Sequence, residues 1–214
     1  MLRLLIDRPP GEPLKILCLG AHSDDIEIGC GATILRLTES MPCAISWVVF
    51  SAGPVREAEA KGCAGLFLRA CGSSRVLIKD FRNGFFPYTA IEIKEYFEQL
   101  KTEVNPDVIF THYRNDLHQD HRLISELTWN TFRNHWILEY EIPKYDGDFG
   151  TPNLFVPITD EICLRKAEYI LKCYVSQKDK HWFTADTFTS MLRLRGVESG
   201  NRYAESFYCR KSLL

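Results

Sequence analysis

The sequence predicts an α/β protein built on a Rossmann-like, mostly parallel sheet with helices on both faces. Three observations support this fold class. Short apolar runs typical of buried strands alternate four times with amphipathic segments typical of helices. Polar or glycine-containing loops separate the two kinds of segment. The 214 residues contain no repeat, linker or low-complexity tract, so we expect one domain over residues 1–214.

The four strand–helix units follow a short N-terminal segment, residues 1–13, which we expect to form a strand or arm and a turn. Expected strands, rich in apolar, β-branched and aromatic residues, lie at residues 15–19, 46–50, 75–78 and 107–111. Expected helices lie at residues 29–38, 56–70, 89–104 and 123–132. In the third helix apolar side chains recur every three or four residues, and Asn105-Pro106 ends it. A polar loop over residues 20–28 should separate the first strand from its helix.

The pattern is less regular after the fourth helix. A further strand is expected at residues 138–142, and a long surface loop at 144–157, which holds two glycines and two prolines. Two more helices are expected at 160–174 and 183–195, and a last strand at 203–208. The polar and aromatic segment 139–146 could cover a site or form a subunit contact.

Composition excludes several classes of protein. The net charge is −2 and no block of five basic residues occurs, so we expect no nucleic-acid partner. No apolar run approaches the ~20 residues of a membrane helix. Eight cysteines without a C-x-x-C pair favour reduced thiols and a cytoplasmic protein. The sequence leaves open whether the chain forms a homo-oligomer.

Two clusters of polar residues each follow an expected strand. The first contains His22, Asp24, Asp25 and Glu27, and the second, in the segment THYRNDLHQDH, contains Asp116, His118, Asp120 and His121. Because parallel strands end at the same edge of a sheet, the two clusters should converge there. Any one of these aspartates alone could be a helix cap. Their occurrence in two clusters favours a metal site.

The residue types in these clusters match a catalytic metal centre. His22, His121 and one of the adjacent aspartates would supply three ligands and leave a position open, as in catalytic zinc sites. The same set describes the facial triad of non-haem iron. Spacing does not say whether Asp24 or Asp25 binds the metal. A carboxylate beside the metal could take the proton of a bound water, and His118, oriented by Asp120, could stabilise an oxyanion.

The two clusters also resemble known motifs. AHSDDIEIGCG, residues 21–31, resembles the A-H-P-D-D-E signature of the LmbE-like, or PIG-L, family of zinc-dependent de-N-acetylases. The segment HQDH, residues 118–121, resembles the H-P-D-H motif of that family. Weaker similarities at residues 56–59, 176–177 and 204–207 extend the resemblance over most of the chain. Ser23 and Gln119 replace the prolines of the two motifs, and Ile26 stands where the family often has glutamate.

The resemblance implies an LmbE-like fold and a role for each matched residue. The implied metal ligands are His22, Asp25 and His121, binding Zn²⁺ or else Fe²⁺ or another divalent metal. Asp24 would be the general base and His118 would stabilise the tetrahedral intermediate, with Asp120 beside it. Expected substrate contacts are Arg56, Asn83 and Asp116. Aromatic side chains that could line the substrate mouth, unless they are core, are Phe85, Phe86, Tyr88, Tyr145, Trp182 and Phe183.

The implied activity is hydrolysis of the N-acetyl group of an amino sugar or sugar conjugate, such as an N-acetylglucosamine derivative, as a small molecule or a glycan. One alternative is a non-catalytic sugar- or nucleotide-binding α/β protein. A dinucleotide-binding protein is disfavoured, because Gly29-Cys-Gly31 lacks the third glycine of that fingerprint. An iron oxygenase is disfavoured because the predicted sheet is parallel, whereas those sites usually lie in antiparallel barrels.

Overall fold

The computed structural model describes residues 6, 9 and 11–213, and its strands form one sheet in the order β3-β2-β1-β4-β5-β7-β6. The strands are β1 (Leu14–His22), β2 (Cys43–Ser51), β3 (Ser73–Ile78), β4 (Val108–His112), β5 (Trp136–Tyr140), β6 (Leu154–Ile158) and β7 (Tyr203–Cys209). The first five run parallel, and β7 pairs antiparallel with both β5 and β6. The predicted α/β fold is therefore confirmed. Most of the expected N-terminal arm, residues 1–13, lies outside the described residues.

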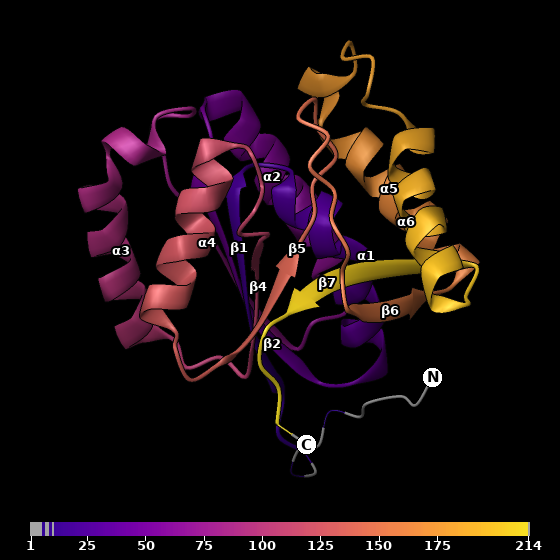
Figure 1. The fold of residues 1–214 in the computed structure, drawn as a ribbon, viewed down its shortest axis with the longest axis horizontal. Helices are drawn as coiled ribbons and strands as arrows, with labels where there is room; N and C mark the ends of the chain where they lie inside the picture. Colours follow the sequence, from indigo (N-terminus) through magenta and orange to yellow (C-terminus); the bar gives the residue numbers. More distant parts are fainter. Residues whose placement is uncertain (1–5, 7–8, 10, 214) are drawn as a thin grey trace.

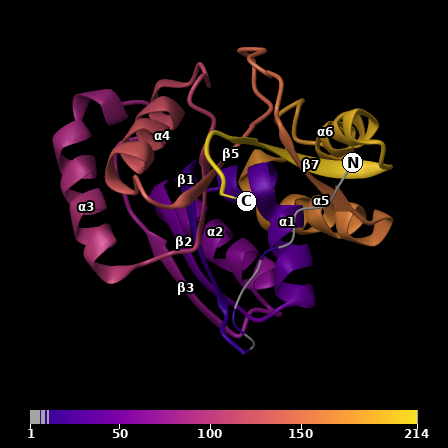
Figure 2. The same cartoon turned by 60° about the horizontal axis from the view of Figure 1, so that its bottom comes forward.

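Helices cover both faces of the sheet (Figures 1 and 2). One face carries α1 (Asp25–Ser40), α2 (Pro54–Phe67), α5 (Asp160–Cys173) and α6 (Ala185–Ser199). The other carries α3 (Ala90–Glu103) and α4 (Gln119–Thr131). Two short 3₁₀ turns, η1 (Phe86–Tyr88) and η2 (Val175–Gln177), complete the helical elements of the described residues. None of the described helices has both the length and the apolar character needed to cross a membrane.

The central strand β1 shows why continuous apolar runs in the sequence predict buried parallel strands. In β1 alternate side chains enter different cores: Ile16 and Cys18 pack under α1, whereas Leu17 and Leu19 pack under α3 and α4. A parallel strand buried on both faces must be apolar at every position. The continuous run of residues 16–19 therefore marks the middle of the sheet.

The boundary between β1 and α1 differs from the prediction, and the difference shapes the site. The expected loop over residues 20–28 is reduced to a turn at Ser23 and Asp24, because β1 continues to His22 and α1 begins at Asp25. Carboxylates in the first helical turn are favourable beside the positive end of the helix dipole. Gly29 and Gly31 lie inside α1, where a Cβ atom would approach the rings of Tyr140 and Phe67 to 2.1 and 2.5 Å. These glycines permit close packing and do not begin the helix.

Two further predictions were wrong in detail. The expected surface loop at 144–157 ends in β6, an edge strand whose Pro157 pairs in register with Ala204 of β7. Proline lacks an N–H, and an edge strand tolerates that loss. The helix expected at 123–132 begins at Gln119, so His121 lies in its first turn.

Candidate active site

The candidate site lies at the carboxyl ends of β1 and β4, which are neighbours in the sheet. The strand order changes direction here, because the chain passes from β1 to β2 on one side and reaches β4 on the other. Ligands of open α/β sheets bind at such switch points. His22 ends β1, Asp25 begins α1, and His121 lies in the first turn of α4. Residues a hundred positions apart in the sequence thus meet at one edge.

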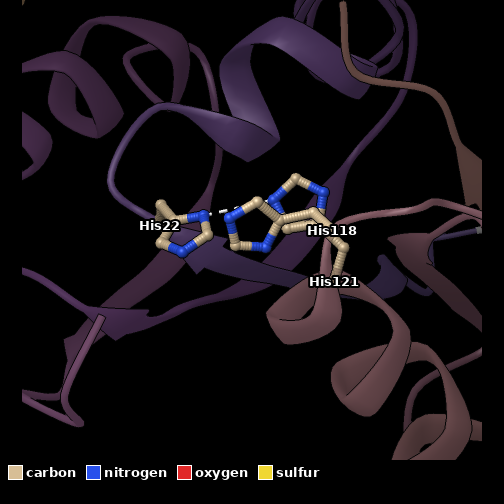
Figure 3. A group of neighbouring side chains, drawn as sticks. All are labelled: His22, His118 and His121. Atoms are coloured by element: carbon tan, nitrogen blue, oxygen red, sulfur yellow. Dashed lines mark hydrogen bonds between the residues drawn. The ribbon is translucent and has the colours of Figure 1, made fainter. Parts of the chain in front are cut away.

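Three ligand atoms converge at this edge. His22 Nδ1 lies 3.1 Å from His121 Nε2, and Asp25 Oδ2 lies 3.3 and 3.5 Å from these two nitrogens. Figure 3 shows the rings of His22, His118 and His121 gathered together, with His22 and His121 in contact. Donors bound tetrahedrally to one zinc ion at 2.0–2.1 Å lie about 3.3 Å apart. The donor types and their spacing therefore fit a divalent metal.

The charges of Asp25 and His121 suit a bound cation. Burial works against ionisation of Asp25, but His121, His112 and His22 hold its pKa well below the usual range. Burial lowers the pKa of His22, yet attraction to Asp25 and contacts with Asp120 outweigh it and raise the pKa to about 10. Burial and the nearby His112 lower the pKa of His121 to about 3. An anionic Asp25 beside a neutral His121 is the state that binds metal, whereas His22, which its raised pKa keeps protonated, would release a proton when a metal binds.

The Asp116 carboxylate contacts the His121 ring nitrogen on the side opposite the candidate metal position. Its Oδ2 lies 2.9 Å from His121 Nδ1 and 3.0 Å from Lys144 Nζ, and its Oδ1 accepts a hydrogen bond of 2.8 Å from the His118 amide. A carboxylate on Nδ1 leaves Nε2 free to face His22 and a metal. Asp116 was expected to contact substrate, but the residue is 1% exposed, does not line the cavity and faces His121. The geometry gives Asp116 a positioning role instead.

Asp120 orients a different histidine from the one expected. Its carboxylate is buried, lies 3.1 Å from His22 Nε2, and accepts hydrogen bonds from the amides of Gly84 and Phe86 at 2.6 and 3.1 Å. Only its backbone contacts the His118 ring, because the Asp120 amide donates to His118 Nδ1 at 3.2 Å. The expectation that the Asp120 carboxylate orients His118 is therefore wrong. It orients His22 and anchors the loop before η1.

His118 is placed to donate a hydrogen bond into the site. Its Nδ1 accepts from a backbone amide at the start of α4, so Nε2 carries the proton of the neutral ring. Burial and the charge of His22 lower the pKa of His118. Its ring lies 4.9 Å from the His22 ring, edge to face. A neutral imidazole with a free N–H suits stabilisation of an oxyanion.

Asp24 stands beside the metal cluster, lines the same cavity and is paired with Arg56. Its Oδ1 lies 2.8 Å from Arg56 Nη2, and the Arg56 guanidinium lies 5.2 Å from the centre of the Tyr174 ring. Burial raises the pKa of Asp24, and Arg56 opposes this shift. A raised pKa makes a carboxylate a stronger base. The structure thus separates the adjacent aspartates, with Asp25 toward the histidines and Asp24 toward Arg56.

Sequence reasoning missed three buried groups around the site. His112 ends β4 with its Nε2 3.2 Å from Asp25 Oδ2 and its ring stacked 3.9 Å from the His121 ring. Its position at a strand end, like that of His22, was the available signal. Tyr140 donates to the Leu19 carbonyl at 2.6 Å, beneath the cluster. The Tyr174 hydroxyl donates to the carboxylate of Glu27. Burial raises the pKa of Glu27 to about 8.

A cavity of about 430 Å³ opens above the cluster. His22, Asp24, Asp25, His118 and His121 all line it, and the expected substrate contacts Arg56 and Asn83 do so too. Of the candidate aromatic residues, Tyr145 and Trp182 line the cavity, whereas Phe183 is core and Phe86 packs 6.1 Å from the His22 ring. The segment after β5 reaches the cavity through Ile142 to Tyr145. The volume suits a small-molecule ligand.

Fold and site together define an α/β protein with a candidate metal centre of two histidines and one carboxylate. The chain belongs to the PIG-L family: residues 17–132, more than half of it, match the family model described as GlcNAc-PI de-N-acetylase. The expected LmbE-like membership is therefore confirmed. The Escherichia coli K12 protein described as uncharacterized deacetylase YaiS is 28% identical over 159 residues, covering 68% of this chain and 83% of YaiS.

Solved structures share the fold at low identity. N,N'-diacetylchitobiose deacetylase from Pyrococcus horikoshii aligns with a TM-score of 0.71 at 23% identity, covering 91% of this chain and 83% of that one. The 4-carboxy-2-hydroxymuconate hydratase GalB from Pseudomonas putida aligns with a TM-score of 0.70 at 17% identity, covering 94% and 98%. The same fold thus carries a deacetylase and a hydratase, so the reaction has to be argued from the site.

Proposed function

We propose that this protein is a divalent-metal-dependent deacetylase that hydrolyses the acetamide of an amino sugar or sugar conjugate. The observation that carries the proposal is the convergence of His22 Nδ1, Asp25 Oδ2 and His121 Nε2 beside the carboxylate of Asp24 and the ring of His118. Membership of a family named for de-N-acetylation supports the same reaction. Zinc fits the donor set, as does iron(II).

His22, Asp25 and His121 would hold the metal, which when bound supplies a polarised acetamide carbonyl and a water of lowered pKa. Asp24 takes the proton of the attacking water, and its contact with Arg56 keeps the carboxylate in place. His118 donates its Nε2 proton as a hydrogen bond to the carbonyl oxygen as charge develops there. The C–N bond then breaks, the proton passes from Asp24 to the leaving nitrogen, and acetate and an amine are released.

The surrounding residues would bind the sugar. Arg56 and Asn83 lie on the cavity wall, where they can contact hydroxyl groups, and Trp182 and Tyr145 offer apolar ring faces. Their position above the candidate metal centre would bring the acetamide of a bound sugar to Asp24 and His118. The substrate class that this arrangement favours is therefore an N-acetylated amino sugar.

The test measures metal content and acetate release together. Protein purified without added metal should contain about one zinc or iron per chain, and Asp25→Ala should lose it. Asp24→Asn should keep the metal but release acetate from N-acetyl sugars 10² to 10⁴ times more slowly, the usual contribution of a general base. Glu57→Gln is the control, because this half-buried carboxylate of α2 pairs with Lys61 and does not line the cavity, and it should behave as the wild type.

Two results would contradict the proposal. Normal turnover by Asp24→Asn would show that another group is the base. Sugar binding without acetate release from a metal-loaded wild type would favour a non-catalytic binding protein.

A further inference from the structure

Three cations and two carboxylates line the cavity above the candidate metal centre. The charged residues that line the cavity are Asp24, Asp25, Arg56, Lys144 and Lys180. Asp25 lies among the histidines, and Asp24 is paired with Arg56. The protein as a whole has a net charge of −2, so this local excess of positive charge is not a property of the entire surface. Such a cavity favours a negatively charged ligand.

Two of the three cations are already paired with carboxylates. Arg56 lies 2.8 Å from Asp24, and Lys144 lies 3.0 Å from Asp116 and 2.6 Å from Asp148. Lys180, by contrast, contacts no carboxylate of the described residues within ion-pair distance. Its ammonium group lies 5.6 Å from the centre of the Trp182 ring. Lys180 is therefore the cation of the cavity that can accept an anion without breaking an existing pair.

The backbone around Lys180 is held by successive turns. The Lys180 amide donates to the Gln177 carbonyl at 3.0 Å, and the Phe183 amide donates to the Lys180 carbonyl at 2.9 Å. The Trp182 ring packs edge to face on Phe183, which is core, with ring centres 5.6 Å apart. The Lys180 ammonium group thus lies over the Trp182 ring on one wall of the cavity. They match a sugar ring and an anionic substituent attached to it.

We propose that Lys180 and Trp182 select amino-sugar substrates that carry a phosphate or carboxylate group. This inference rests on the proposed deacetylase function and names the class of substrate more closely. The sugar ring lies against Trp182, its anionic group contacts Lys180, and its acetamide reaches the floor of the cavity. Lys180 is a specificity-determining residue in this arrangement.

The test compares three N-acetylglucosamine derivatives: the neutral methyl glycoside, the carboxymethyl glycoside and the 1-phosphate. The wild type should prefer at least one of the two anionic compounds in kcat/KM. Lys180→Ala should lower the ratio of anionic to neutral kcat/KM about tenfold, mainly through KM, the size of one charge-assisted hydrogen bond. Lys180→Arg should keep the preference, and added salt should weaken it. Comparing kcat/KM for the carboxymethyl glycoside and the 1-phosphate shows whether the protein prefers a carboxylate or a phosphate.

Lys178 provides a matched control. It belongs to the same short segment and is exposed, but it does not line the cavity. Lys178→Ala should leave the ratio unchanged. Equal losses in the Lys178 and Lys180 variants, or no preference for either anion in the wild type, would overturn the inference.

A binding measurement separates this inference from the proposed function. Dissociation constants of the three compounds are measured by calorimetry on Asp24→Asn, which should not turn them over. Tighter binding of an anionic compound that is lost in Asp24→Asn/Lys180→Ala supports the anion position even if no acetate is ever released. Acetate release with equal binding of all three compounds overturns the anion position and leaves the deacetylase standing.

Discussion

Replacing Asp116 by asparagine tests whether the site depends on a residue that never reaches the cavity. Both carboxylate oxygens of Asp116 are used: Oδ2 by His121 and Lys144, and Oδ1 by the His118 amide. Asparagine keeps the volume but has one oxygen, so its NH₂ group must face either an N–H donor or the His121 ring. We expect the affinity for zinc to fall tenfold to a hundredfold, the usual cost of losing the partner of a histidine ligand.

The assay is a competition titration of chelator-treated protein with Zn²⁺ and a chromophoric chelator at fixed pH. Asp148→Asn is the control, because Asp148 also contacts Lys144, at 2.6 Å, and accepts from the Leu117 amide, but touches no histidine. Its zinc affinity should change by less than about threefold, since only a partly exposed network is altered. An unchanged affinity in Asp116→Asn, or equal losses in both variants, would refute the reasoning.

Two further predictions concern stability, each measured by denaturant unfolding. Gly29→Ala should lower the free energy of unfolding by about 3 kcal/mol or more, because the new Cβ would lie 2.1 Å from the buried Tyr140 ring. Gly65→Ala, where a Cβ would meet no atom within 4 Å, should raise the free energy of unfolding by about 1 kcal/mol. An equal effect of the two would contradict the packing argument. Lys166→Met should lower the free energy of unfolding by about 3–5 kcal/mol, because it removes the counter-charge of the buried Glu205 carboxylate, which lies 2.6 Å from Lys166 in the wild type. A decrease below about 1 kcal/mol would show that stability does not depend on this ion pair.

Much of the site could be predicted because it follows from the order of a parallel sheet. The apolar runs located β1 and β4, and the polar residues after them had to emerge at one edge. His22, Asp25 and His121 do meet there, and Asp24 and His118 line the same cavity. The roles assigned to these five residues remain predictions that the metal and turnover measurements test.

The partners of individual side chains could not be predicted from spacing. Asp116 and Asp120 were expected at the substrate and at His118, but they contact His121 and His22. Asp120 lies in the first turn of α4, where successive residues point about 100° apart, so a small rotation of the helix changes its neighbours; Asp116 lies in the loop that leads into α4, and its position depends on the same packing. That rotation is set by packing of the helix against the sheet, which no local pattern records.

The sequence by itself determined the fold class, the edge of the sheet that carries the site, and the residue types gathered there. These depend on periodicity and strand order, which are properties of the chain taken in order. Only the tertiary structure decided that Asp24 pairs with Arg56, that His112 and Asp116 stand behind His121, and that Lys180 is the unpaired cation among the described residues of the cavity. Distances between elements far apart in the sequence decide such contacts, because they are fixed by how the helices and loops pack on the sheet.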